Sequence, residues 1–433
     1  MTREEFEYLR SDQARTLIER HIGDDPLKMA LDGLPAPVCT QVKLLGKCRA
    51  KLPDYYDRRC IVTRVGFEQS SSRATAFSRG YSGETALDLT CGLGCDAYAL
   101  SRSFRRVVTV ERDALLADIA RYNFSLLGCG NIEVVCADSA EYVERLSGRF
   151  DMVYIDPARR DTGRRVFLLQ DCSPDVTAMA SRLVELSDRV VIKASPLFDV
   201  DEAERLLSVY GMVDTNTVSV CGECKETIVE LMPRSDGTGS SRSVTVISHG
   251  TTERYSFSKQ EMAAAVEALS GRVSAYDGED ATDDARSLRQ ESFAAEHLPD
   301  KGNASGGSYA DSRTCGSEPE GYILLPDAAF VKSRTVEALA ARLAGVRLDR
   351  RSGVMFSDKP SGLCALRSYK IGQTMPFRPK ALKKLFKERG IVGVTIIKRG
   401  IGMSVEETRA RLGVKEGSDA TLILCGDRVY FVE

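Results

Sequence analysis

The chain has 433 residues, a formal net charge of −2 at pH 7 and 28% charged residues. That length predicts two to three domains, and a charge balance so close to zero excludes a partner held by global charge alone. No run of about 18 apolar residues is present that could span a bilayer. The first seven residues, Met-Thr-Arg-Glu-Glu-Phe-Glu, are too acidic and polar for a signal peptide. We therefore predict a cytoplasmic protein with no membrane partner.

Thirteen cysteines are scattered along the chain without the spacing of a disulfide framework. Cys221 and Cys224 form the one close pair of the CxxC type, and neither a second pair nor a nearby histidine accompanies them. A zinc site needs about four such ligands. The pattern therefore predicts reduced thiols and no bound metal.

Residues 1–80 have the pattern of a small helical region. Apolar residues recur at helical spacing over 4–21, and a second helical stretch runs over 38–52. Residues 67–77 are polar. Two interpretations of this polar segment stay open: a solvated loop, or a lid over a bound ligand. In the second, a carboxylate is held by Ser71, Thr75 and Arg79.

Strands and helices alternate between 84 and 232. Predicted strands are 84–90, 106–110, 132–136, 150–155, 189–194, 213–220 and 227–232. Predicted helices are 96–104, 113–127, 139–147, one that ends near 186, and 201–210. Such alternation predicts an α/β fold with a Rossmann-like, doubly wound, mostly parallel sheet of seven strands.

Acidic residues end four consecutive strands of this sheet: Asp88, Glu111, Asp138 and Asp156. Ligands of doubly wound sheets bind outside the carboxyl ends of the strands. Glu111 can accept two hydrogen bonds from a ribose diol, and Asp138 can accept from the exocyclic amine of adenine. These residues predict an adenosine site.

A glycine-rich turn follows the first of these strands. We expect Asp88, Gly92 and Gly94 to face the amino and carboxylate end of the ligand. No Gly-x-x-x-x-Gly-Lys-Ser/Thr motif is present, which argues against ATP hydrolysis. Gly92-x-Gly94-x-x-Ala97 also satisfies a loose dinucleotide pattern, so an NAD enzyme stays open, although Asp88 would repel a pyrophosphate.

The residues after 270 form an acidic segment that is followed by a basic one. Residues 271–320 contain 11 acidic and 5 basic residues, and we predict a mobile acidic linker or a long insertion over 270–320. Residues 331–400 contain 17 Lys or Arg and 4 Asp or Glu, a net charge of +13. Predicted strands here are 321–325, 352–356, 364–370, 393–398, 420–424 and 428–432. Predicted helices are 334–343, 379–389 and 404–411.

The predicted helix over 379–389 has an apolar stripe and a basic face. Lysine and arginine at this density indicate a phosphate-binding surface, and the lack of an evident helix-turn-helix favours RNA over DNA. A solvated charged face, or one neutralised by the acidic linker, stays open.

The residues Asp88-Leu-Thr-Cys-Gly-Leu-Gly94, Glu111, Asp138 and Asp156-Pro-Ala-Arg-Arg160 resemble the motifs of class I S-adenosylmethionine-dependent methyltransferases. The resemblance covers roughly 67–232. With Gly222-Glu-Cys-Lys-Glu226 and Ile397-Lys-Arg-Gly400, the chain is similar to bacterial methyltransferases that carry a THUMP-like C-terminal domain. The resemblance implies an RNA substrate, tRNA or rRNA. It implies S-adenosylmethionine held by Asp88, Thr90, Gly92, Gly94, Glu111, Arg112, Asp138, Ser139 and Thr75.

Asp156-Pro157 lies where amino methyltransferases of this class carry Asp/Asn-Pro-Pro-aromatic. There the side chain and the proline carbonyl accept from an exocyclic amine and aim it at the methyl group. Ala158 and Arg159 depart from that pattern, and Arg159 and Arg160 could stack on a flipped base or clamp a phosphate. The predicted catalytic residues are Asp156, Pro157 and Arg159. The predicted RNA contacts are Arg160, Lys193, Lys380, Lys383, Lys384, Lys387, Lys398 and Arg399.

Four domains follow: a helical region over 1–80, a methyltransferase domain over 81–235, a connecting region over 236–320, and a basic α/β domain over 321–433. The first hypothesis is an RNA methyltransferase acting on a base nitrogen. A methyltransferase for a small molecule or protein, and a non-catalytic RNA-binding protein with a vestigial pocket, stay open. Cys224 is either a nucleophile or a buried core cysteine. The oligomeric state is not set by the sequence.

Overall fold

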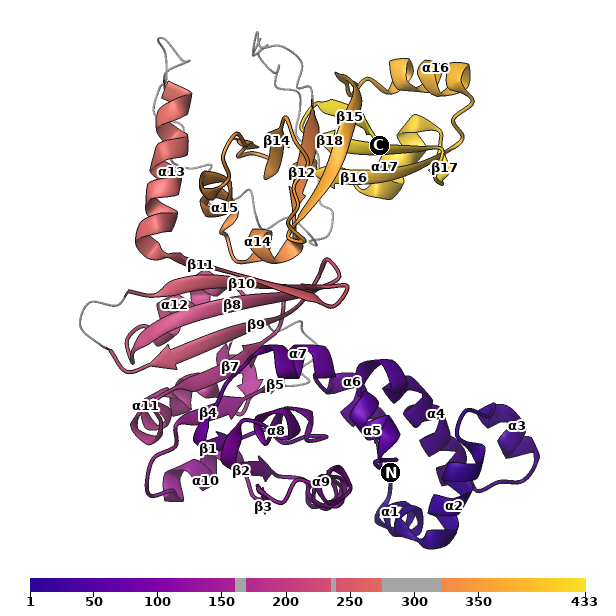
Figure 1. The fold of residues 1–433 in the computed structure, drawn as a ribbon, viewed down its shortest axis with the longest axis vertical. Coiled ribbons are helices and arrows are strands. Elements are labelled where there is room, and N and C mark those ends of the chain that lie inside the picture. Colours follow the sequence, from indigo (N-terminus) through magenta and orange to yellow (C-terminus); the bar gives the residue numbers. More distant parts are fainter. Residues whose placement is uncertain (160–168, 235–238, 275–320) are drawn as a thin grey trace, which may run out of the picture. The chain divides into compact units, whose positions relative to one another are not determined.

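The computed structural model describes residues 1–159, 169–234, 239–274 and 321–433. These residues form two compact units, drawn in Figure 1. The first comprises Met1–Val220 and Cys224–Thr245, and the second comprises Cys221–Glu223 and Val246–Glu433. Most of the predicted acidic segment 270–320 lies outside the described residues. The domain boundaries at 80, 235 and 320 stay predictions.

The first unit begins with a series of helices. They are α1 (Arg3–Arg10), α2 (Asp12–His21), α3 (Pro26–Leu31), α4 (Ala36–Lys51), α5 (Pro53–Asp57), α6 (Arg64–Gln69) and α7 (Arg73–Ser78). The helical pattern predicted over 4–21 is divided between α1 and α2, because Ser11 has an extended backbone and caps α2, accepting from Ala14 N at 3.3 Å. The polar segment 67–77 contains helical turns, because Thr63 and Ser72 cap α6 and α7.

The sheet that follows contains every strand predicted between 84 and 232. These strands are β1 (Gly83–Asp88), β2 (Phe104–Glu111), β3 (Ile132–Cys136), β4 (Met152–Ile155), β7 (Val190–Ala194), β8 (Met212–Val220) and β9 (Glu223–Met232). β1 pairs in parallel with β2 and β4, β2 with β3, and β4 with β7. β7 pairs antiparallel with β9, so the sheet is mixed.

The predicted number of seven strands is wrong. The order over the described residues is β11-β10-β8-β9-β7-β4-β1-β2-β3, a nine-stranded sheet. The additional strands are β10 (Ser241–Ser248), which contains the boundary between the two units, and β11 (Thr251–Ser258). Both are rich in serine, threonine and charged residues. Because their apolar residues alternate only weakly, the sequence pattern assigns them to the connecting region and not to strands.

Successive residues of the parallel strands face two separate cores, as the alternation of a strand requires. Ala86 belongs to one core with residues of α8 (Cys95–Leu100) and α9 (Ala114–Leu127). Its neighbour Leu87 belongs to a second core, with residues of three further helices. They are α10 (Ser139–Arg145), α11 (Val176–Leu186) and α12 (Val200–Leu207). The two covered faces explain the near-continuous apolar runs of these strands.

A short excursion follows β4. β5 (Ala158–Arg159) pairs antiparallel with β6 (Cys172–Ser173), and the 3₁₀ helix η1 (Leu169–Asp171) precedes β6. The residues between β5 and η1 include Arg160, which lies outside the described residues.

The second unit has its own mixed sheet, in the order β13-β14-β12-β15-β19-β18-β16-β17. β16 pairs in parallel with β18, whereas β12 pairs antiparallel with β15. The strands are β12 (Tyr322–Pro326), β13 (Arg347–Asp349), β14 (Val354–Ser357), β15 (Leu366–Pro376), β16 (Gly393–Arg399), β17 (Lys415–Glu416), β18 (Ala420–Cys425) and β19 (Arg428–Val432). The six predicted strands are present, and the sequence missed the short β13 and β17.

The helices of the second unit are α13 (Lys259–Ser274), α14 (Ala328–Lys332), α15 (Val336–Arg342), α16 (Pro379–Arg389) and α17 (Val405–Leu412). The bounds predicted for α16 are confirmed. Pro379 opens this helix and Gly390 ends it in the left-handed conformation, which is the usual placement of the two residues. In the described parts of the chain, no helix is both long and apolar enough to cross a membrane.

Candidate active site

The turn after β1 is tied to both neighbouring strands. Leu89 N donates to Tyr154 O of β4 at 2.9 Å, and Cys91 N donates to Val110 O of β2 at 2.9 Å. Gly94 N closes the turn on Cys91 O at 2.8 Å. The turn is therefore fixed at the carboxyl ends of the parallel strands, where ligands of such sheets bind.

Both glycines of the turn have a positive φ, +54° at Gly92 and +87° at Gly94. A Cβ added at Gly92 would meet nothing within 4 Å, so the space beside this residue is open. A Cβ added at Gly94 would lie 2.6 Å from Cζ of Phe124. Gly92 thus leaves room for a ligand, whereas Gly94 lets the turn pack against α9.

Asp88 lies beneath the turn. Its side chain is fully buried and accepts hydrogen bonds from Thr90 N at 3.0 Å and Thr109 Oγ1 at 2.7 Å. Burial raises the pKa of Asp88 to about 7, against the lowering effect of these two hydrogen bonds. The expectation that Asp88 faces the charged end of a ligand conflicts with this burial. Its carboxyl group instead supports the turn from within the sheet.

Glu111 lies at the end of β2, as predicted. Its Oε2 accepts from Gly92 N at 2.9 Å, and its Oε1 accepts from Asp113 N at 3.0 Å. A carboxylate oxygen has two lone pairs, so both oxygens keep capacity for the hydroxyls of a ribose. Arg112, the next residue, is exposed. Contacts of Glu111 and Arg112 with a cofactor stay predictions.

Asp138 and Ser139 follow β3 at the same edge of the sheet. Asp138 is exposed and caps α10, accepting from Ala140 N at 2.9 Å through Oδ1. Ser139 Oγ donates to Leu89 O at 2.5 Å, which ties this loop to the turn after β1. The capping bond uses Oδ1, and a contact of Asp138 with an adenine amine stays a prediction.

Thr90 joins the turn to the predicted catalytic residue. Its Oγ1 accepts a hydrogen bond from Asp156 N at 2.7 Å. The carboxylate of Asp156 forms an ion pair with Lys193, with 2.6 Å between Oδ2 and Nζ. Burial raises the pKa of Asp156, and the Lys193 ammonium opposes that rise. The Lys193 side chain is 14% exposed, and the predicted contact of Lys193 with RNA stays a prediction.

A buried ion-pair cluster, which the sequence did not predict, lies beside this pair. Arg79 binds Asp96 (Nη1 to Oδ1, 2.5 Å) and Glu226 (Nη2 to Oε2, 2.9 Å), and Ser71 Oγ donates to Asp96 Oδ2 at 2.9 Å. One interpretation of the sequence is that Arg79 holds a carboxylate of a bound ligand. In the structure, Arg79 instead binds the carboxylates of Asp96 and Glu226. Asp96 and Glu226 lie 17 and 147 residues from Arg79, and no local pattern links them.

The other predicted site residues have varied positions. Thr75 is buried, and its Oγ1 donates to Ser72 O at 3.1 Å within the first turn of α7. Pro157 follows Asp156. Only the backbone of Arg159 is described, in β5. Roles for these residues stay predictions.

Two family models match the chain. The model described as Conserved hypothetical protein 95 matches residues 71–167, which carry the glycine turn, Glu111, Asp138 and Asp156. The model described as THUMP domain-like matches residues 366–432, which lie in the second unit.

Two similar proteins match nearly the whole chain. An uncharacterised S-adenosylmethionine-dependent methyltransferase of Mycobacterium tuberculosis H37Rv is 23% identical over 382 residues, 88% of each chain. A solved structure of a candidate methyltransferase from Porphyromonas gingivalis W83 has a TM-score of 0.72 at 23% identity, and covers 97% of this chain and 96% of that one. That likeness shows a shared fold. The chain is an S-adenosylmethionine-dependent methyltransferase with a THUMP-like C-terminal domain.

A third relative of this methyltransferase matches a shorter stretch. An uncharacterised RNA methyltransferase of Thermotoga maritima is 32% identical over 83 residues, 19% of each chain. The identification excludes the NAD enzyme that the loose glycine pattern left open.

The raised pKa of Asp88 has a consequence for stability. Between about pH 4 and 7 the folded methyltransferase retains a proton on Asp88 that the unfolded chain has lost, so the free energy of unfolding falls as pH rises through this window. We expect Asp88→Asn to remove this dependence. Wild type should lose roughly 3 kcal/mol more stability than Asp88→Asn between pH 5 and pH 8, measured by urea unfolding. Parallel pH profiles would contradict the raised pKa.

Proposed function

We propose that this methyltransferase transfers a methyl group from S-adenosylmethionine to RNA, at a nitrogen of a base. The observation that carries the proposal is the basic face of α16 in the THUMP-like unit. The relative from Thermotoga maritima, an RNA methyltransferase by name, supports the same substrate class.

Helix α16 has one apolar and one basic face. Leu382 and Phe386 are buried in a core of the second unit. Four exposed lysines follow the helical spacing i, i+3, i+4 and i+7: Lys380, Lys383, Lys384 and Lys387. Lys384 also lies 3.8 Å from Glu388, an exposed pair that is easily broken. A row of this kind fits the phosphates of a nucleic-acid backbone.

Lys398 and Arg399 do not both belong to that surface. They are consecutive residues of β16, so their side chains leave opposite faces of the sheet. Lys398 shares a face with Val394 and Ile396, which pack in the same core as α16. Arg399 shares the other face with Ile397. We therefore propose α16 and Lys398 as one RNA surface. Contacts of Arg160, Lys193 and Arg399 with RNA stay predictions.

The residues at the turn fit the cofactor. The space beside Gly92 is open, Glu111 offers oxygens for a ribose, and Asp138 offers one for an adenine amine. S-adenosylmethionine supplies an activated methyl group on its sulfonium. Asp156 would accept from a base amine through Oδ1 while Lys193 holds Oδ2. Positioning of this kind is most of what the transfer requires.

The proposal can be tested with total RNA from cells that lack the gene as the substrate, because the target nucleotides in this RNA are unmodified. Purified protein with tritium-labelled S-adenosylmethionine should label this RNA and leave RNA from cells with the gene unlabelled. Mass spectrometry of nucleosides then names the modified base. We expect Asp156→Ala to lower transfer by at least about a hundredfold, because the base amine loses its acceptor. Label in protein or metabolites, with none in RNA, would contradict the proposal.

The role of α16 has a matched control. Lys383 and Lys387 are exposed at spacing i, i+4 on α16, and Lys43 and Lys47 are exposed at the same spacing on α4. We expect Lys383→Glu/Lys387→Glu to weaken RNA binding about tenfold at 150 mM salt and to reduce the slope of log K against log salt by about 2. Lys43→Glu/Lys47→Glu should bind nearly as wild type. Equal losses in filter-binding assays would show that α16 is not the binding surface.

A further inference from the structure

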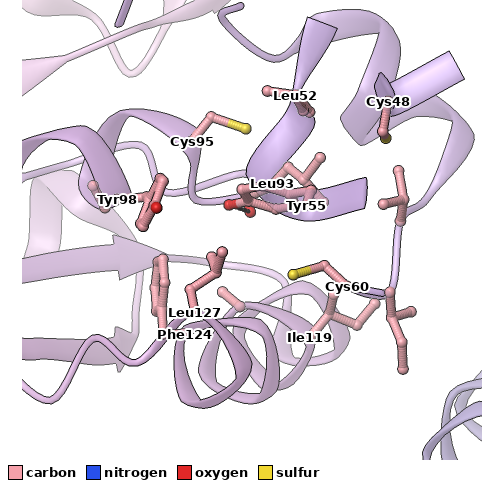
Figure 2. Close-up of a cluster of buried hydrophobic side chains, with 14 of the residues drawn as sticks. Cys48, Leu52, Tyr55, Cys60, Leu93, Cys95, Tyr98, Ile119, Phe124 and Leu127 are labelled. Atoms are coloured by element: carbon pink, nitrogen blue, oxygen red, sulfur yellow. Dashed lines mark hydrogen bonds between the residues drawn. The ribbon is translucent and has the colours of Figure 1, made fainter. Parts of the chain in front are cut away.

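The N-terminal helices of the first unit pack into the same core as the glycine turn. Tyr55 of α5 and Cys48 of α4 share a buried cluster with Leu93 of the turn, Tyr98 of α8 and Phe124 of α9. Figure 2 shows Tyr55 and Leu93 side by side in this cluster. The helices predicted within residues 1–80 thus share one buried core with the glycine turn.

Two buried amides hold the chain after α5 in place. Asn123 of α9 accepts from Ile61 N at 2.8 Å and donates to Ile61 O at 2.9 Å. Gln41 of α4 accepts from Val62 N at 3.0 Å and donates to Val62 O at 2.7 Å. Both side chains are buried, and each pairs with both the backbone N–H and the backbone carbonyl of one residue. The segment between the N-terminal helices and the sheet is therefore fixed on both sides.

Tyr55 connects this fixed segment to the glycine turn. Its side chain is 1% exposed, and its hydroxyl donates to Leu93 O at 3.0 Å. Leu93 lies between the two glycines, so its carbonyl belongs to the peptide plane whose N–H is that of Gly94. Burial raises the pKa of Tyr55 well above its usual value, so the hydroxyl keeps its proton and stays a donor.

A turn of two glycines has little rigidity of its own, because glycine populates positive and negative φ about equally. The backbone bonds to β2 and β4 fix Leu89 and Cys91 at the start of the turn. The hydroxyl of Tyr55 fixes Leu93, at its far end. Glu111 holds Gly92 N, between these points.

We propose that Tyr55 is a positioning residue for the cofactor: its hydrogen bond to Leu93 O sets the peptide planes of the glycine turn against which S-adenosylmethionine binds. The proposal rests on the cofactor of the methyltransferase and not on RNA as its substrate. It assigns a role in cofactor binding to a residue that lies outside both regions matched by the family models.

Tyr55→Phe tests the proposal, since it removes one oxygen and keeps the ring that fills the core. Tyr98→Phe is the matched control. Tyr98 lies in the same cluster, with its ring 6.3 Å from that of Tyr55, but its hydroxyl accepts from the exposed Arg102 and not from the turn. Calorimetric titration with S-adenosylmethionine at 15 °C measures Kd, and thermal unfolding without ligand measures stability.

We expect Tyr55→Phe to raise Kd about five- to tenfold, because Leu93 O loses its buried donor and the turn samples other conformations. Tyr98→Phe should stay within about twofold of wild type. A purely structural role would lower the melting temperature of Tyr55→Phe and leave its Kd unchanged, which would overturn the proposal. Equal losses of affinity in both variants would overturn it too. So would a Tyr55→Phe protein that does not fold, because the bond would then serve the fold and not the site.

Discussion

The structure depends on how the turn after β1 is held. A turn with two left-handed glycines gains no order from local preference, so its shape comes from bonds to neighbouring elements. Backbone groups of β2 and β4 bind its first half, Asp88 holds Thr90 from below, and Tyr55 binds Leu93. Glu111 and Ser139, two of the residues predicted to contact the cofactor, form hydrogen bonds with this turn.

Thr90 connects the two halves of the proposed chemistry. Its backbone N–H donates to Asp88, and its hydroxyl accepts from the backbone of Asp156. Thr90 therefore connects the end of β1 to the end of β4. It lies between the glycine turn and Asp156, the residue proposed to accept a hydrogen bond from the target amine. The ion pair of Asp156 with Lys193 and the cluster around Arg79 keep the neighbouring buried carboxylates compensated.

Sequence reasoning succeeded where the pattern was periodic. Four of the parallel strands are apolar runs that are followed by acidic residues, and α16 opens with proline and closes with glycine. It failed where the chain lacks periodicity or where partners lie far apart. Ser11 interrupts a helical pattern without changing its spacing. The partners of Arg79, Lys193 and Tyr55 lie on other elements, and a side chain's type does not reveal whether it faces a ligand or another side chain.

Hydrogen–deuterium exchange with and without S-adenosylmethionine tests the central claim most directly. The account predicts slower exchange in the cofactor complex over 89–94 and at the ends of β2 and β3, around 111–113 and 137–141, with little change in α16. Protection confined to other parts of the chain, or no protection at saturating cofactor, would contradict it.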